Sequence, residues 1–340
     1  MVRRIALALA AALYSAPALA DAPLNYLTAH SAKEAPVLML TWALIAISLA
    51  VVVVVGVLLS LAVLPRRGQA PAPPGETIPL APAEAASGLG WIWIGVGVSS
   101  VILLATTVWT MAVLAQVNAP PRDPPLTIEV TAHQWWWQVR YLSKDPSKIF
   151  TTANEIHIPT GTPVRVRLVA ADVIHSFWAP QLSGKTDLIP GQTNIQWFDA
   201  EDPGVYRGQC AEYCGLQHAK MSLLVIADRP ASFKSWLAHQ LQPAKSPANA
   251  AARAGLNDFV LHCGSCHAVR GSDAAGIVGP DLSHLMTRRT IAAGSYPNTV
   301  GYLSGWIADP QSLKPGSMMP RLGLTGPQLA RIRAYLQTLK

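Results

Sequence analysis

Two long apolar segments dominate the first third of the chain. Residues 37–64 and 89–117, 28 and 29 residues long, contain no Asp, Glu, Lys or Arg. A helix needs about 20 apolar residues to cross the hydrocarbon core of a bilayer, so each segment can span with tilt or with a protruding end. A buried core helix of this length rarely lacks all charge. The pattern predicts a membrane anchor, residues 21–120, with two transmembrane helices at about 37–64 and 89–117.

Residues 1–20, MVRRIALALAAALYSAPALA, have the layout of a signal peptide. Arg3 and Arg4 form a basic start, an apolar stretch follows, and small residues precede Asp21. The alternative, a first membrane span, is disfavoured because the apolar stretch is short and contains Pro17. Two spans return the chain to the side where it began. We therefore expect everything after about residue 118 on the periplasmic side of a bacterial-type inner membrane.

The pattern changes from Leu126 to short alternating runs. Residues 164–168, VRVRL, alternate as a half-buried strand does, and Pro and Gly residues separate the runs. Many short strands with regular turns predict an all-β sandwich or barrel over residues 121–242. The predicted strands are 127–130, 155–158, 164–169, 193–198 and 222–226.

The remaining sequence is helical in pattern. Residues 231–241 predict a helix, and residues 243–252 predict a linker because Pro and Ala are frequent there. Helices are then expected at 254–262, 299–308 and 328–339. Residues 253–340 are therefore expected to form a small all-α domain.

Composition agrees with a membrane portion. Hydrophobic residues make up 51% of the chain and charged residues 13%, against about a quarter charged in a soluble domain. The net charge is +7, and residues 243–340 contribute most of it. A basic chain often binds nucleic acid, but an exported location excludes that partner and leaves membrane lipid as the expected surroundings.

The run CAEYCGLQHAKM, residues 210–221, packs four candidate metal ligands into twelve residues. A disulfide between its cysteines would leave His218 and Met221 without a role. Zinc accepts Cys and His but has no use for a thioether. Thiolates, imidazole and thioether together are soft ligands, which favours copper. Copper is therefore the prediction, with zinc and a disulfide as the alternatives.

This run resembles the CuA signature of subunit II of cytochrome c oxidase, and residues 172–180, DVIHSFWAP, resemble the upstream ligand segment of that family. The family has a two-helix anchor and a cupredoxin-like domain that holds two coppers. The resemblance implies that two cysteines bridge the coppers, that one histidine caps each, and that a methionine and a backbone carbonyl are weak ligands. These positions are Cys210 and Cys214, His175 and His218, and Met221 and Glu212. The side chain of Glu212 would bind a magnesium ion shared with the catalytic subunit.

Three tryptophans in a row, residues 135–137, are unusual in a strand. Neighbouring side chains on a strand point to opposite faces, so we expect at least one of them to be exposed or to lie against another subunit. The same resemblance implies that Trp135 accepts electrons from cytochrome c. The middle position is often Tyr in the family and is Trp136 here.

A second cluster, CGSCH at residues 263–267, has the spacing of covalent heme c attachment. The alternative is a thioredoxin-like redox pair, but the βαβ context for one is absent. Residues 253–340 resemble a small class I cytochrome c. That resemblance implies heme attachment through Cys263 and Cys266, and iron ligation by His267 and by Met319 in the run KPGSMMP, with Met318 as the local rival. The carbonyl of Pro280 would orient His267.

Together these features predict a caa-type subunit II, the electron-accepting subunit of a heme-copper terminal oxidase. It would pass electrons from a soluble or membrane cytochrome c, through heme c and CuA, to subunit I, which reduces oxygen to water beside other oxidase subunits. Two alternatives are the equivalent subunit of a nitric oxide reductase and a stand-alone membrane-tethered carrier. Glu84, before the second span, is a weak candidate for a proton pathway.

Overall fold

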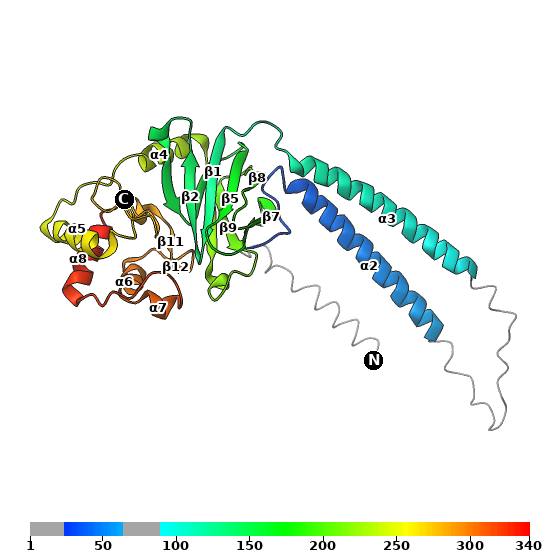
Figure 1. The fold of residues 1–340 in the computed structure, drawn as a ribbon. Coiled ribbons are helices and arrows are strands. Elements are labelled where there is room, and N and C mark those ends of the chain that lie inside the picture. Colours follow the sequence, from blue (N-terminus) through cyan, green and yellow to red (C-terminus); the bar gives the residue numbers. More distant parts are fainter. Residues whose placement is uncertain (1–23, 64–88) are drawn as a thin grey trace, which may run out of the picture. The chain divides into compact units, whose positions relative to one another are not determined.

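The computed structural model describes residues 24–63 and 89–340 (Figure 1). The predictions for the signal peptide and for Glu84 lie outside the described residues. The chain divides into two units, residues 35–119 and the remainder.

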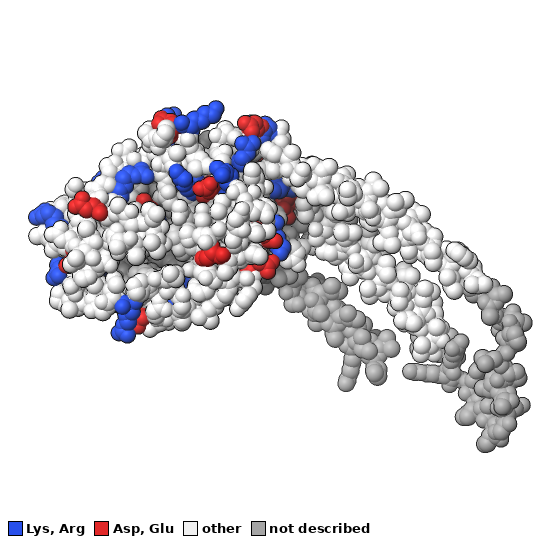
Figure 2. All heavy atoms as spheres, in the orientation of Figure 1, with Lys and Arg blue, Asp and Glu red and all other residues white. Residues whose placement is uncertain are grey.

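The first unit is a pair of apolar helices, α2 (Ala35–Val63) and α3 (Leu89–Asn118). Both are long and apolar enough to cross a membrane. Neither contains a charged residue, and Figure 2 shows none along them. Their large apolar side chains are mostly exposed, which suits a lipid surrounding. The predicted two-helix transmembrane hairpin is confirmed.

The second unit begins with a β-sandwich of two five-stranded sheets, as predicted. The first sheet has the order β3-β2-β1-β5-β8, with β1 (Leu126–His133), β2 (Trp136–Leu142), β3 (Phe150–Ala153), β5 (Val164–Ala170) and β8 (Asn194–Phe198). The second has the order β4-β10-β9-β6-β7, with β4 (Glu155–Pro159), β6 (His175–Ala179), β7 (Ser183–Leu188), β9 (Gly204–Cys210) and β10 (Ser222–Asp228).

Alternating side chains from the two sheets form the core of this sandwich. In β5, Val164, Val166 and Leu168 are buried, whereas the arginines between them are only half-buried. Trp137 and Phe177 are fully buried and meet edge to face, with ring centroids 6.0 Å apart. Such aromatic packing gives the strand ends a rigid base. Helix α4 (Pro230–Gln240) follows the last strand.

The C-terminal part is a small helical domain with one short hairpin. Its elements are α5 (Ala250–Cys263), β11 (Thr290–Ile291), β12 (Tyr296–Pro297), α6 (Val300–Ala308), α7 (Pro310–Leu313) and α8 (Gly326–Leu336). Helices α5 and α8 cross closely at Gly255, where an added Cβ would lie 1.9 Å from the carbonyl oxygen of Arg331. Helix α5 begins inside the segment expected to be linker, because the side chain of Asn249 caps it by accepting from the N–H of Ala252.

Candidate functional site

The first cluster lies where strands β6 and β9 meet. His175 begins β6 and Cys210 ends β9, and the two strands are paired so that Phe177 lies opposite Cys210. The chain then turns back through Cys214 and a 3-10 helix, His218–Lys220, to Met221, immediately before β10. Strand pairing thus brings His175 beside the run of residues 210–221, which is distant from it in sequence.

The donor atoms of this cluster lie within range of shared metal ions. The two thiol sulfurs are 3.7 Å apart, and the Sγ atom of Cys210 lies 3.8 Å from His175 Nδ1 and 3.3 Å from the Glu212 carbonyl oxygen. The Sγ atom of Cys214 lies 3.6 Å from His218 Nδ1 and 3.8 Å from Met221 Sδ. Two donors at about 2.0–2.3 Å from one tetrahedral metal are roughly 3.5 Å apart. All six predicted positions therefore come together.

The two thiols form a coupled acid pair and not a disulfide, since an S–S bond is about 2.05 Å long. The hydrogen bond with Cys214 lowers the pKa of Cys210, because it stabilises the Cys210 thiolate. The same bond raises the pKa of Cys214. The pair can release one proton easily and the second with difficulty. A bound cation would replace the shared proton, so the donor set fits a metal bridged by both sulfurs.

Asp172 orients the upstream histidine, a role that the sequence analysis missed. Its Oδ1 atom lies 2.8 Å from His175 Nε2, so the opposite ring nitrogen, Nδ1, faces Cys210. The backbone N–H of Gln134 donates to the other carboxylate oxygen of Asp172 at 2.6 Å. Carboxylates commonly support a metal-binding histidine in this way. The sequence did contain a signal for this role, because the carboxylate of Asp172 lies only three residues before His175.

Trp135 is joined to the cluster by a hydrogen bond. Its Nε1–H donates to the carbonyl oxygen of Cys214 at 2.9 Å, and the Gln134 side-chain amide donates to the same oxygen at 2.7 Å. Of the three tryptophans, Trp135 and Trp137 are buried and Trp136 is half-buried, so a contact of one of them with another subunit stays a prediction. Trp135, 8% exposed, lies under residues of the C-terminal domain.

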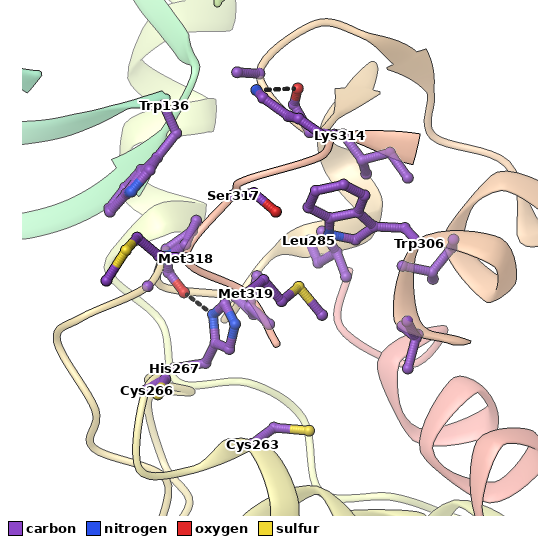
Figure 3. Close-up of a pocket in the computed structure, with 18 of the residues that line it drawn as sticks. Trp136, Cys263, Cys266, His267, Leu285, Trp306, Lys314, Ser317, Met318 and Met319 are labelled. Carbon is purple, nitrogen blue, oxygen red and sulfur yellow. Dashed lines mark hydrogen bonds between the residues drawn. The ribbon is translucent and has the colours of Figure 1, made fainter. Parts of the chain in front are cut away.

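The second cluster lines a pocket in the C-terminal domain (Figure 3). Cys263 and Cys266, at the end of α5, lie at one side of it with His267. The Nδ1 atom of His267 is 2.8 Å from the carbonyl oxygen of Pro280, the contact expected from the sequence. Burial lowers the pKa of His267, which keeps the imidazole neutral as a metal ligand must be. The remaining nitrogen, Nε2, is left for iron.

The two methionines of the downstream loop differ in position. Both line the pocket, but Met319 extends toward its middle, whereas Met318 points toward Trp136 and is 77% exposed. The side chain of Gln311 holds this loop by donating to the Met319 carbonyl oxygen at 2.7 Å.

Arg288, which the sequence analysis missed, also lines this pocket. Its Nε atom is buried and has no hydrogen-bond partner among the described residues. An unpaired buried guanidinium nitrogen fits a pocket whose ligand carries negative groups, and heme has two propionates. The residues of the pocket therefore fit a covalently attached heme c.

Comparison with known proteins agrees with both clusters. Residues 141–228 match the family model "Cytochrome C oxidase subunit II, periplasmic domain", and residues 252–340 match "Cytochrome c". Cytochrome c oxidase subunit 2 of Alkalihalophilus pseudofirmus is 37% identical over 244 residues, which cover 71% of this chain and 69% of the relative. The subunit 2 of a Bacillus species is 35% identical over 256 residues, covering 70% of each chain.

A solved structure of the periplasmic domain of subunit II from Bradyrhizobium japonicum is 32% identical and covers 35% of this chain and 95% of that one, with a TM-score of 0.32. The sequence relatives extend over more than two thirds of their own length, and both matched family models fall on the domains that carry the two clusters. This chain belongs to the cytochrome c oxidase subunit 2 family, as a membrane-anchored, electron-transferring subunit with a fused cytochrome c domain.

Proposed function

We propose that this subunit takes electrons from a soluble or membrane cytochrome c through heme c and passes them through a binuclear copper centre to subunit I. The observation that carries the proposal is the arrangement of Cys210 and Cys214. Each sulfur lies within 3.8 Å of the other and of at least one further donor, so one pair of sulfurs can serve two metal ions.

In this proposal the chain's own residues fall into two groups: cysteines shared by both metal ions, and donors that bind one ion each. Cys210 and Cys214 would hold both metal ions. His175 and His218 would each bind one of them, and the Met221 thioether and the Glu212 carbonyl would be weak donors, one to each ion. Copper bound there supplies one-electron redox chemistry. Burial of the sulfurs and support from paired strands hold the donors in one geometry, which favours rapid electron transfer.

For the heme, Cys263 and Cys266 would provide the covalent links, and His267 and Met319 would bind the iron. Pro280 fixes the His267 tautomer, because its carbonyl accepts from Nδ1. Arg288 supplies a buried positive charge for the propionate side. Met319 is preferred over Met318 because it extends into the pocket.

Three further assignments complete the proposal. The half-buried carboxylate of Glu212, 3.8 Å from Lys185 Nζ, binds magnesium together with the catalytic subunit. The two long apolar helices support a location in a bacterial-type inner membrane, among its lipids. Subunit I holds the oxygen-reducing site, and the other oxidase subunits assemble around it.

Spectroscopy of the purified full-length chain tests the copper assignment. We expect two copper ions per chain and an electron paramagnetic resonance signal with hyperfine coupling to two equivalent coppers. Zinc in that site, or a Cys210–Cys214 disulfide after gentle purification, would refute it.

A pair of variants tests the heme ligand. Met319→Ala should abolish the sulfur-to-iron absorption band of the oxidised heme, and Met318→Ala should retain it. The reverse result would make Met318 the ligand.

A further inference from the structure

Lys314 is a buried lysine at the junction of the β-sandwich and the cytochrome c domain. Its side chain is 2% exposed. The Nζ atom donates to the carbonyl oxygens of Trp135 at 2.7 Å, Lys220 at 2.8 Å and Ala292 at 3.1 Å. An ammonium group has three N–H donors, so these three acceptors use all of them.

The acceptors of Lys314 belong to two different domains. Trp135 and Lys220 belong to the β-sandwich, and Ala292 lies in the hairpin region of the cytochrome c domain. Burying an ammonium group is costly unless all its donors are paired. Burial lowers the pKa of Lys314 to about 7, a sign of that cost. Carbonyl groups from both domains offset this cost at Lys314. The contact is therefore a specific interface between the two domains rather than a chance contact.

The segment that Lys314 begins also carries the proposed iron ligand. In residues 314–319, the carbonyl of Pro315 accepts from the side chain of Gln217 at 2.8 Å. Gly316 lies over the tryptophan: a Cβ added there would be 3.6 Å from Trp135 Cη2. The heme-ligand loop is thus seated on the residue whose indole N–H bonds to Cys214.

A second set of contacts joins the same two domains through backbone groups. The carbonyl oxygen of Ala293 accepts from both the N–H and the hydroxyl of Ser222, each at 3.0 Å. The buried carboxylate of Glu155 accepts from the N–H groups of Arg289 at 2.7 Å and Thr290 at 3.0 Å. These hydrogen bonds, each with a backbone group of the cytochrome c domain, require one relative placement of the domains.

Gly294 shows how close this approach is. A Cβ added to it would lie 1.9 Å from Ser222 Oγ, so a larger residue would displace the Ser222 hydroxyl from the Ala293 carbonyl. Gly323, in the same domain, has a similar left-handed φ of +64° against +72° for Gly294, but an added Cβ would meet nothing within 4 Å. The two glycines form a matched pair for experiment.

We propose that Lys314 is a positioning residue that seats the heme-ligand loop on Trp135, so that Trp135 serves this chain's own cytochrome c domain. The inference rests on the proposed function. In the step that it serves, one electron leaves the heme iron and reduces the copper pair, and no bond or proton moves. An external cytochrome c must then dock on the cytochrome c domain, because the chain itself covers Trp135.

Hydrogen exchange of the full-length chain tests the joint without reference to activity. In Lys314→Met, three carbonyls lose the ammonium donor, and that of Trp135 is buried. We expect protection of the N–H groups of Ser222 and Thr290 to fall by about tenfold or more, while amides within β5 and α8 keep theirs. Gly294→Ala should have the same effect, and Gly323→Ala should not. Unchanged protection in both Lys314→Met and Gly294→Ala would overturn the proposal.

Flash photoreduction of the heme in the intact oxidase tests the consequence. We expect Lys314→Met to slow copper reduction by about tenfold or more, with heme and copper contents and the heme potential unchanged. The rate should also become dependent on solvent viscosity, because the domain must dock again before each transfer. A variant that transfers at the wild-type rate refutes the role of Lys314 alone. Failure of the wild-type chain to reduce copper from heme would instead refute the proposed function.

Discussion

At the scale of single residues, the ability to bind a cofactor depends on the type of each ligand side chain and on the hydrogen-bond partner that orients it. The proposed copper ligands are soft donors, and their supports are ordinary polar groups. His175 is turned by Asp172, and His267 by the Pro280 carbonyl. Each support contacts the nitrogen opposite the one that faces the site. The supports should therefore affect cofactor binding although neither touches the cofactor.

Replacing Asp172 tests this at the copper site. In Asp172→Asn the carboxylate that accepts from His175 Nε2 is lost, so His175 should be held less firmly. We expect copper affinity to fall by about 10–100-fold, measured by competition with a chelator in the full-length chain. Asp123→Asn is a suitable control, because Asp123 is an exposed partner of Arg165 far from the site. Equal affinities in the two variants would exclude a supporting role for Asp172.

At the scale of elements, each site lies where rigid structure ends and a loop begins. Strand β6 begins and strand β9 ends at the proposed copper cluster, and helix α5 ends at the first of the proposed heme-attachment cysteines. The loop after α5 wraps tightly around His267, and the N–H of Gly279 donates to the Cys266 carbonyl at 2.8 Å. A rigid base with short closing loops positions ligands more accurately than a long flexible segment.

Gly279→Ala tests how tightly that loop is packed. An added Cβ would lie 2.6 Å from His267 Cε1, so the ring or the loop must move. We expect a loss of about 1–3 kcal/mol in the unfolding free energy of the cytochrome c domain, followed by the heme absorption during denaturation. Gly301→Ala, in α6 with open space around it, should instead be neutral or stabilising by up to about 1 kcal/mol. Equal effects would show that close packing at Gly279 is unimportant.

At the scale of the whole molecule, segments far apart in sequence build one extramembrane unit. Residues 24–34 precede the first membrane helix yet pack against the β-sandwich. The hydroxyl of Ser31 donates to Asp199 at 2.6 Å, and Lys33 Nζ donates to the Trp197 carbonyl at 2.7 Å. The chain is thus tied to its domain immediately before it enters α2, which limits the freedom of that connection.

Ser31→Ala removes the first of these ties. Ser31 and Asp199 are both buried, so the carboxylate would lose a donor that water cannot easily replace. We expect the β-sandwich to be destabilised by about 1–3 kcal/mol, measured as unfolding of the full-length chain in detergent. Ser143→Ala, at an exposed position where, among the described residues, the hydroxyl accepts only from the Asp145 N–H, should change stability by less than about 0.5 kcal/mol. No difference between the variants would mean that residues 24–34 do not stabilise the domain.

Short-range patterns were sufficient for much of this protein. The two apolar segments, the strands near 155–158 and 222–226, and the helices near 299–308 and 328–339 could be predicted because each depends on local periodicity. The four side-chain ligands of residues 210–221 could be predicted as one cluster because they lie within twelve consecutive residues. Strands β2, β6, β7 and β9 were not predicted, since Trp-rich or Gly-containing runs do not alternate clearly.

Tertiary structure decided which distant residues meet. Strand pairing of β6 with β9 brings His175 to Cys210, and only then does Asp172 become a support. A lysine such as Lys314 reads as a surface residue in sequence, because its burial depends on acceptors contributed by a second domain. Local order is encoded within a few residues, whereas a joint between domains depends on contacts that exist only after both have folded.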